Sequence, residues 1–249
     1  MRPGDGTPGP DRVDGPGTPG PDRPAARPGG AAARPGGAGG APAAGSGALV
    51  WYAAYGSNLH APRLARYLLG GRPEGGALAC PGCRDPRPPL RDVPVLLPGL
   101  LYFATESAVW GGGRGFYDPD AAGPAPGRAY LLTLGQFSDI AAQEMYRSPG
   151  TDLDLTGVLA TGRATLGPGR YETLVHAGEL DGLPLLTLTA PTGLAGADLN
   201  PPSAAYLRTL AAGLAQAHGW DSRRTARYLA SRPGAAGHWS AQGVLEALA

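Results

Sequence analysis

The chain lacks lysine altogether: its 21 basic residues are all arginine, and isoleucine occurs once, at Ile140. We interpret this bias as the codon usage of a GC-rich genome rather than as a functional device. The 20 acidic residues leave a formal net charge of only +1. Nucleic acids and anionic membranes attract proteins with a basic excess. We therefore expect neither as a partner.

Cysteines and long apolar runs are also scarce. Two cysteines are too few for a disulfide framework. Cys80 and Cys83 have the spacing of half a zinc site, but no second pair accompanies them, so two incidental cysteines are the better interpretation. No stretch approaches the roughly 18 apolar residues of a membrane span. No apolar run suited to a signal peptide precedes Ala48. These absences predict a soluble, cytoplasmic protein.

Glycine and proline, in contrast, are abundant, with 42 and 28 residues. Residues 1–47 contain 14 of these glycines and 10 of these prolines, and the heptapeptide GTPGPDR occurs there twice. Val13 is the only branched apolar residue in this stretch, so little apolar burial can offset the entropy cost of ordering it. We predict that residues 1–47 form a disordered tail. A start codon assigned upstream of the true one is the alternative.

Apolar patterning in the remaining residues predicts alternating strands and helices. Strands are expected at 48–55, 93–97, 100–105, 128–134, 153–160, 173–180 and 183–190. The Asp181-Gly182 pair joins the last two as a hairpin. Helices are expected at 62–69, 137–146, 203–218, 221–231 and 240–248. Ser57 or Asn58 would cap the first helix, and Ser203 the third. The pattern predicts a mixed α+β domain with a compact, barrel-like sheet.

A loop of small and polar residues follows the first strand, and its sequence is Tyr55-Gly56-Ser57-Asn58-Leu59. Backbone N–H groups converge at such a strand-to-helix turn, where they can bind a carboxylate or stabilise an oxyanion. The side chains of Ser57 and Asn58 add further donors. The loop is therefore a candidate binding element, and an ordinary strand–helix turn is the alternative.

Glu144 lies on the apolar stripe of its predicted helix, together with Phe137, Ile140 and Ala141. A carboxylate that faces a core must be paired or must have a raised pKa. A raised pKa suits a general acid/base that works near neutral pH. Glu144 is thus a candidate catalytic residue, and a structural ion pair with Arg147 is the alternative.

These features together resemble the γ-glutamylcyclotransferase-like superfamily, and the member that they resemble is of the actinobacterial type. The resemblance rests on the Tyr55–Leu59 loop after an N-terminal strand and on a helical Gln143-Glu144 about 85 residues later. Trp110-Gly-Gly and Pro202-Ser203-Ala-Ala-Tyr206 support it. It covers roughly residues 49–215. We therefore predict a γ-glutamylcyclotransferase-like domain at 48–215 and a C-terminal helical extension at 216–249 that packs on it.

The resemblance implies an α+β fold, a small mixed β-barrel with surrounding helices, and an enzyme without metal or cofactor. The substrate would be a small-molecule γ-glutamyl amide or a related acylated amine. Its own α-amine would attack the γ-carbonyl and give 5-oxoproline and a free amine, with Glu144 as general acid/base. The implied substrate-binding residues are Tyr55, Gly56, Ser57, Asn58, Leu59 and Tyr206.

Other functions stay open at this point. An amide hydrolase or deacylase of the deacetylase type is one alternative, and a non-catalytic small-molecule-binding module is another. Ser57 as a covalent nucleophile would need a histidine that the sequence alone cannot place beside it. Arg128 and Arg147 are candidates for binding the substrate's α-carboxylate. At the position where the superfamily often has a tyrosine, this chain has Thr151, and Tyr146 lies closer to Glu144.

Overall fold

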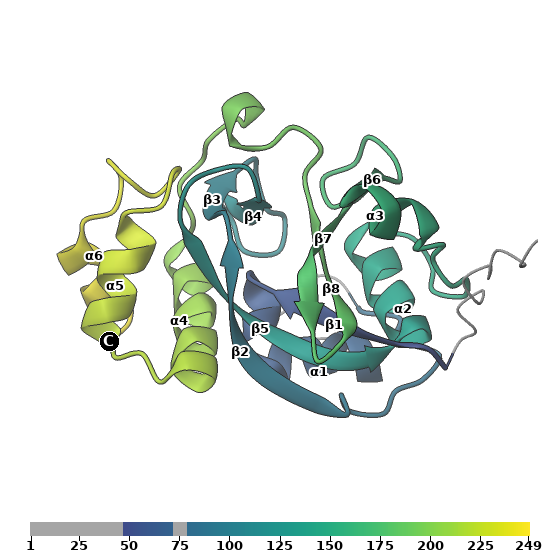
Figure 1. The fold of residues 1–249 in the computed structure, drawn as a ribbon. Coiled ribbons are helices and arrows are strands. Elements are labelled where there is room, and N and C mark those ends of the chain that lie inside the picture. The colour runs from purple at the N-terminus through teal and green to yellow at the C-terminus, as the bar shows by residue number, and fades with distance from the viewer. Residues whose placement is uncertain (1–46, 72–78) are drawn as a thin grey trace, which may run out of the picture. The chain divides into compact units, whose positions relative to one another are not determined.

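The structure is a computed structural model that describes residues 47–71 and 79–249 (Figure 1). The tail predicted for residues 1–47 lies outside the described residues apart from Gly47. Helices and strands are both present in the described part, which confirms the α+β prediction. None of the described helices combines the length and the apolar character that crossing a membrane requires.

The larger sheet has six strands. Its order is β2 (Arg91–Pro98), β5 (Pro124–Thr133), β1 (Leu49–Ala54), β8 (Leu183–Thr189), β7 (Thr173–Leu180) and β6 (Arg163–Thr165). The β1 strand pairs antiparallel with β5 and parallel with β8, so the sheet is mixed. A separate two-stranded sheet consists of β3 (Leu100–Ala104) and β4 (Arg114–Asp118).

The smaller sheet is tied to the larger one by a side chain. The Thr189 hydroxyl at the end of β8 accepts a hydrogen bond from the Tyr117 amide at 3.1 Å and donates one to the Tyr117 carbonyl at 2.5 Å. One hydroxyl thus satisfies both backbone groups of a β4 residue. Strand β4 therefore lies against β8 without a continuous backbone ladder between them.

Strand β1 is buried on both faces because helices cover the sheet on each side (Figure 1). Trp51 and Ala53 join one apolar cluster with residues of α4 (Ala204–His218), α5 (Ser222–Ala230) and α6 (Ala241–Ala247). Val50 and Tyr52 join a second cluster with residues of α1 (Ala61–Leu69), α2 (Leu134–Glu144) and α3 (Thr156–Thr161). Two-sided burial explains why the strand lacks apolar–polar alternation.

Local sequence signals explain most of the helix ends. Thr133 and Gln136 form a capping box at the start of α2. Ser203, Asp221 and Ser240 cap α4, α5 and α6 with their side chains. The predicted boundary at residues 215 and 216 lies within α4, and the division of the chain there stays a prediction.

Two expectations for local structure were wrong. Residues 153–160 do not form a strand: α3 covers Thr156–Thr161, because Leu155 and Val158 are buried at helical spacing. Ser57 and Asn58 do not cap α1 but form the 3-10 turn η1 (Ser57–Leu59), and His60 precedes α1 without a side-chain cap.

Candidate active site

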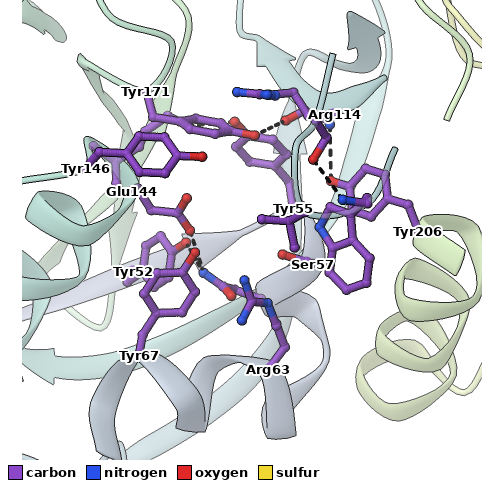
Figure 2. A pocket seen from close by; sticks show the side chains of 17 residues that line it. Tyr52, Tyr55, Ser57, Arg63, Tyr67, Arg114, Glu144, Tyr146, Tyr171 and Tyr206 are labelled. Atoms are coloured by element: carbon purple, nitrogen blue, oxygen red, sulfur yellow. Dashed lines mark hydrogen bonds between the residues drawn. The ribbon is translucent and has the colours of Figure 1, made fainter. Parts of the chain in front are cut away.

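An inner cavity of about 80 Å³ lies where β1, η1, α1, β4, α4 and the C-terminal end of α2 meet (Figure 2). Its wall contains seven aromatic and three charged side chains. The lining residues are Tyr52, Tyr55, Gly56, Ser57, Asn58, Arg63, Tyr67, Ser107, Val109, Trp110, Arg114, Gly115, Glu144, Tyr146, Tyr171, Leu188 and Tyr206.

Asn58 fixes the loop against the rest of the wall. The side chain is 3% exposed, and the Tyr130 hydroxyl donates to its backbone carbonyl at 2.8 Å. Its Nδ2 donates to the Tyr52 hydroxyl at 3.2 Å and to Glu144 Oε1 at 3.1 Å (Figure 2). Its Oδ1 is buried and has no hydrogen-bond partner in the described part of the chain. Asn58 thus connects the loop to the carboxylate and has an unused acceptor.

The η1 turn also provides backbone donors. The first N–H groups of a helical turn have no intrahelical acceptor. In η1 these belong to Ser57 and Asn58, because the turn's first backbone bond runs from the Leu59 amide to the Gly56 carbonyl at 3.0 Å. Gly56 leaves room for the close approach of Tyr206, since a Cβ at Gly56 would make a tight contact of 3.3 Å with the Tyr206 hydroxyl. The turn can therefore present two amides to an anionic or carbonyl oxygen.

Glu144 is the last residue of α2, and its carboxyl group points into the cavity (Figure 2). Burial raises the pKa of this carboxyl, while hydrogen bonds from Tyr67 and Asn58 and the positive charges of Arg63 and Arg114 oppose the rise. The net effect is a pKa above the ordinary value. Such a carboxyl can take up and release a proton closer to neutral pH than an exposed glutamate can.

Tyr206, in the first turn of α4, closes the cavity on the side of β4. Its hydroxyl accepts a hydrogen bond from the Gly115 amide at 3.1 Å, and the Tyr171 hydroxyl donates to the Gly115 carbonyl at 2.8 Å. A Cβ at Gly115 would lie 2.7 Å from the Tyr206 hydroxyl, so only glycine fits without movement. The Trp110 ring stacks on Tyr206 with centroids 5.4 Å apart. Burial raises the pKa of Tyr206 to about 12, so its hydroxyl keeps its proton.

Two arginines in the wall form no ion pair with an acidic side chain of the described residues. Arg114 is 7% exposed, and burial together with the nearby Arg170 lowers its pKa. It donates to the Glu106 carbonyl, but its Nε is buried and has no partner in the described segments. Arg63 lies over the rings of Tyr67 and Trp110, and its Nε is likewise unpaired. The wall therefore has positive charge available for an anionic ligand.

The arginines that the sequence suggested lie elsewhere. Arg128 pairs with Asp92 at 2.6 Å, and Arg147 pairs with Glu172 at 2.6 Å. Neither lines the inner cavity. The pairing of Arg147 with Glu172 also removes it as the partner of Glu144. Arg63 could have been identified from its place one turn into the helix after the loop. Arg114 had no comparable signal.

The structure brings most of the proposed site residues together. Glu144, the loop residues Tyr55, Gly56, Ser57 and Asn58, and Tyr206 all line the inner cavity. Leu59 does not line it: this side chain is buried in the core, where α4 approaches it at Gly213. The Tyr55 hydroxyl donates its proton to the Leu188 carbonyl at 2.6 Å.

A second, outer cavity of about 300 Å³ adjoins the first. Both cavities share Arg63, Tyr67, Val109, Glu144, Tyr146 and Tyr171. The outer cavity is further lined by Ala79, Cys80, Pro81, Ala108, Gln143, Arg147 and Ser148. Glu144 thus lies at the junction of a small compartment and a larger one.

Cys83 and the histidines lie outside both cavities, whereas Cys80 lines the outer one. Cys83 donates its thiol proton to the Tyr67 carbonyl at 3.3 Å, and burial raises its pKa to about 12. Both cysteines are free. Within residues 47–71 and 79–249, no group of three or more His, Cys, Asp or Glu side chains could hold a metal ion. None of the four histidines lines either cavity.

Comparisons with known proteins complete this description. No protein-family model matches the chain. Among curated proteins, "Histone deacetylase 5" of Arabidopsis thaliana is 32% identical over an alignment of 185 residues, which covers 67% of this chain and 28% of that protein. The chain thus spans little more than a quarter of this relative. Among solved structures, a "Gamma-glutamyl cyclotransferase" and a human protein described as uncharacterized each have a TM-score of 0.44 and 15% identity. The alignments cover 80% of this chain and 99% and 98% of those chains, respectively.

Proposed function

We propose that the protein converts a γ-glutamyl amide to 5-oxoproline and a free amine, with Glu144 as general acid/base. The observation that carries this proposal is the position of Glu144. Its carboxyl has a raised pKa, accepts a hydrogen bond from Asn58 and lies between a small cationic cavity and a larger one. An anionic end of the substrate is matched by the positive charge of the smaller cavity.

The inner cavity would hold the γ-glutamyl group. Its α-carboxylate would bind Arg114, because that guanidinium is buried and lacks an acidic partner in the described part of the chain. The carbonyl oxygen under attack would accept hydrogen bonds from the Ser57 and Asn58 amides. Donors placed at a developing oxyanion typically contribute about 3–4 kcal/mol each to the barrier reduction.

The proton transfers follow from this pose. The α-ammonium must lose a proton before its nitrogen can attack, and Glu144 as carboxylate accepts one. The new C–N bond closes the five-membered ring, and the old C–N amide bond breaks as Glu144 protonates the leaving nitrogen. The regenerated carboxylate then accepts the second proton of the ring nitrogen and passes it to the released amine. Both protons lost by the α-nitrogen end on the released amine, so the reaction needs no water and no redox partner.

Hydrolysis of an acylated amine is the second candidate, since the curated relative is named a histone deacetylase. That name describes a protein of which this chain matches 28%. Because no metal-binding group of side chains occurs within the described segments, water attack here would rely on Glu144 as the base. A γ-glutamyl amide would then give glutamate in place of 5-oxoproline.

One assay separates these functions. Purified protein is incubated with γ-glutamyl amides and with N-acetylated amines, and the products are identified by mass spectrometry. We expect 5-oxoproline from the γ-glutamyl amides and no release of acetate. Glutamate or acetate as the product would favour hydrolysis. Binding of these amides without turnover would favour a binding module, and undiminished turnover in Glu144→Gln would refute the role of Glu144.

A further inference from the structure

The outer cavity has a chemical character of its own. Two of its polar side chains are already in use: the Gln143 amide donates to the Tyr67 carbonyl at 3.0 Å and to the Asp139 carbonyl at 3.2 Å, and Arg147 pairs with Glu172. Apart from Arg63 and Glu144, which the two cavities share, the wall consists largely of the apolar surface of Pro81, Ala108, Val109 and Tyr146.

Two of these apolar side chains face solvent although they are large. Val109 is 46% exposed and Tyr146 is 59% exposed, and both line the two cavities on either side of Glu144. Exposed apolar surface around a cavity is typical of a binding site whose occupant covers it. The occupant of the outer cavity should therefore be apolar where it contacts this wall.

The linings of the two cavities assign the two parts of a substrate, because the buried Arg114 lines only the inner cavity, whereas Pro81 and Ala108 line only the outer one. The inner cavity has a volume of about 80 Å³ and the outer one about 300 Å³. An apolar cavity of about 150 Å³ accommodates a benzene molecule, so the outer cavity has room for a group larger than one aromatic ring. The breaking bond must lie at Glu144, which is at the junction. The γ-glutamyl group then lies in the inner cavity and the amine in the outer cavity.

We propose, on the basis of the function proposed above, that the outer cavity binds the amine that is released, and that this amine carries a bulky apolar group. The preferred substrates are γ-glutamyl amides of large apolar primary amines rather than of small or highly polar ones. Such an amine has two chemical sources, an alkyl or aryl amine and an α-amino acid with a large apolar side chain. Both place the same apolar body against Pro81, Ala108 and Val109.

Four synthetic amides test this proposal and separate the sources. γ-Glutamyl-methylamide and γ-glutamyl-phenethylamide differ only in apolar bulk, and γ-glutamyl-glycine and γ-glutamyl-phenylalanine repeat the comparison with a carboxylate on the amine. We expect kcat/KM for 5-oxoproline release to be at least about tenfold higher for each bulky amide than for its small counterpart, because even one methylene in an apolar pocket changes specificity by that order. The source is identified by comparing kcat/KM for the two bulky amides: a higher value for the phenethylamide indicates an alkyl or aryl amine, and a higher value for γ-glutamyl-phenylalanine indicates an α-amino acid.

A variant that fills the cavity provides the structural control. Ala108 is exposed in a turn and lines only the outer cavity, so Ala108→Trp fills space without disturbing the core. We expect it to reduce the ratio of kcat/KM between the phenethylamide and the methylamide to about one. Ala122→Trp is the matched control, since Ala122 is also exposed and lines neither cavity. It should leave the ratio unchanged.

The outcomes distinguish this proposal from the one on which it rests. Equal or better turnover of the small amides, or an unchanged ratio in Ala108→Trp, would overturn the outer-cavity assignment and leave the cyclisation intact. Absence of 5-oxoproline from all four amides would refute the cyclisation. In that case calorimetric binding of the intact amides to Glu144→Gln still decides the cavity assignment: tighter binding of the bulky amides supports it, and equal binding overturns it.

Discussion

Among single substitutions in the cavity wall, we expect Asn58→Asp to change the ionisation of the Glu144 carboxyl the most. The Nδ2 of Asn58 lies 3.1 Å from Glu144 Oε1, and the substitution replaces this donor by a carboxylate oxygen. Two unit charges at that separation repel by about 5 kcal/mol at an effective dielectric constant of about 20. Both carboxyls therefore cannot ionise at neutral pH, and the pair retains one proton.

Retention of this proton makes the stability of the variant depend on pH. Above the ordinary carboxyl pKa of about 4, the unfolded chain releases both protons while the folded pair keeps one. The folded state then binds more protons, so stability falls as pH rises, by about 1.4 kcal/mol per pH unit until the shared proton is lost. For a domain of this size the melting temperature should fall by about 3–5 °C per pH unit relative to the wild type.

The assay is thermal unfolding of Asn58→Asp, Asn58→Ala and the wild type between pH 5 and pH 8, together with pH profiles of turnover. Asn58→Ala is the matched control, because it removes the hydrogen bond to Glu144 without adding a charge. We expect the fall of stability with rising pH to extend to higher pH in Asn58→Asp than in the wild type and Asn58→Ala, together with a shift of the acid limb of kcat/KM to higher pH. A wild-type pH dependence of stability in Asn58→Asp would refute the close contact between residue 58 and Glu144.

Three further predictions concern separate parts of the molecule. Glu144→Gln should lower turnover by about 10²–10⁴-fold. The raised pKa of Glu144 makes the wild type less stable as pH rises. In thermal unfolding, Glu144→Gln should therefore have the higher melting temperature at pH 8, and the melting temperatures of the two proteins should converge toward pH 4. Gly213→Ala should destabilise the fold by about 1–3 kcal/mol in denaturant titrations, because its Cβ would lie 2.5 Å from the Leu59 Cβ; Gly157→Ala, in helix α3 with space around it, should be neutral or stabilising. Cys83 should resist alkylation at pH 8 in the folded protein, because its thiol pKa is raised to about 12, and rapid labelling of Cys83 found by peptide mass spectrometry would contradict this.

Parts of the fold with a local cause could be predicted from the sequence. The β1 strand shows its two-sided burial in its unbroken apolar run, and the structure indeed divides Trp51 and Val50 between two clusters. The caps of α4, α5 and α6 are single residues whose side chains act within one helical turn. Such features depend on residues that are close together in the chain, so they can be predicted from the sequence alone.

The features that were missed depend on distant partners. Arg114 enters the cavity wall because β4 pairs with β3, with Arg114 opposite Ala104. That pairing joins segments on either side of a glycine-rich turn, and no periodicity of the sequence indicates it. The short apolar run around Leu155 and Val158 fits a strand or a helix equally well. The helix forms because it buries both side chains in the apolar cluster that also contains residues of α1 and α2.

The absence of lysine has a counterpart in the inner cavity. Its lining residues include no lysine, histidine, cysteine or aspartate. Guanidinium groups keep their charge in proteins, and burial raises the pKa of five of the six lining tyrosines, at positions 52, 55, 67, 171 and 206. The pKa of Glu144, in contrast, is raised toward neutrality. A change of pH near neutrality therefore acts mainly on this carboxyl and on the amine of the bound ligand.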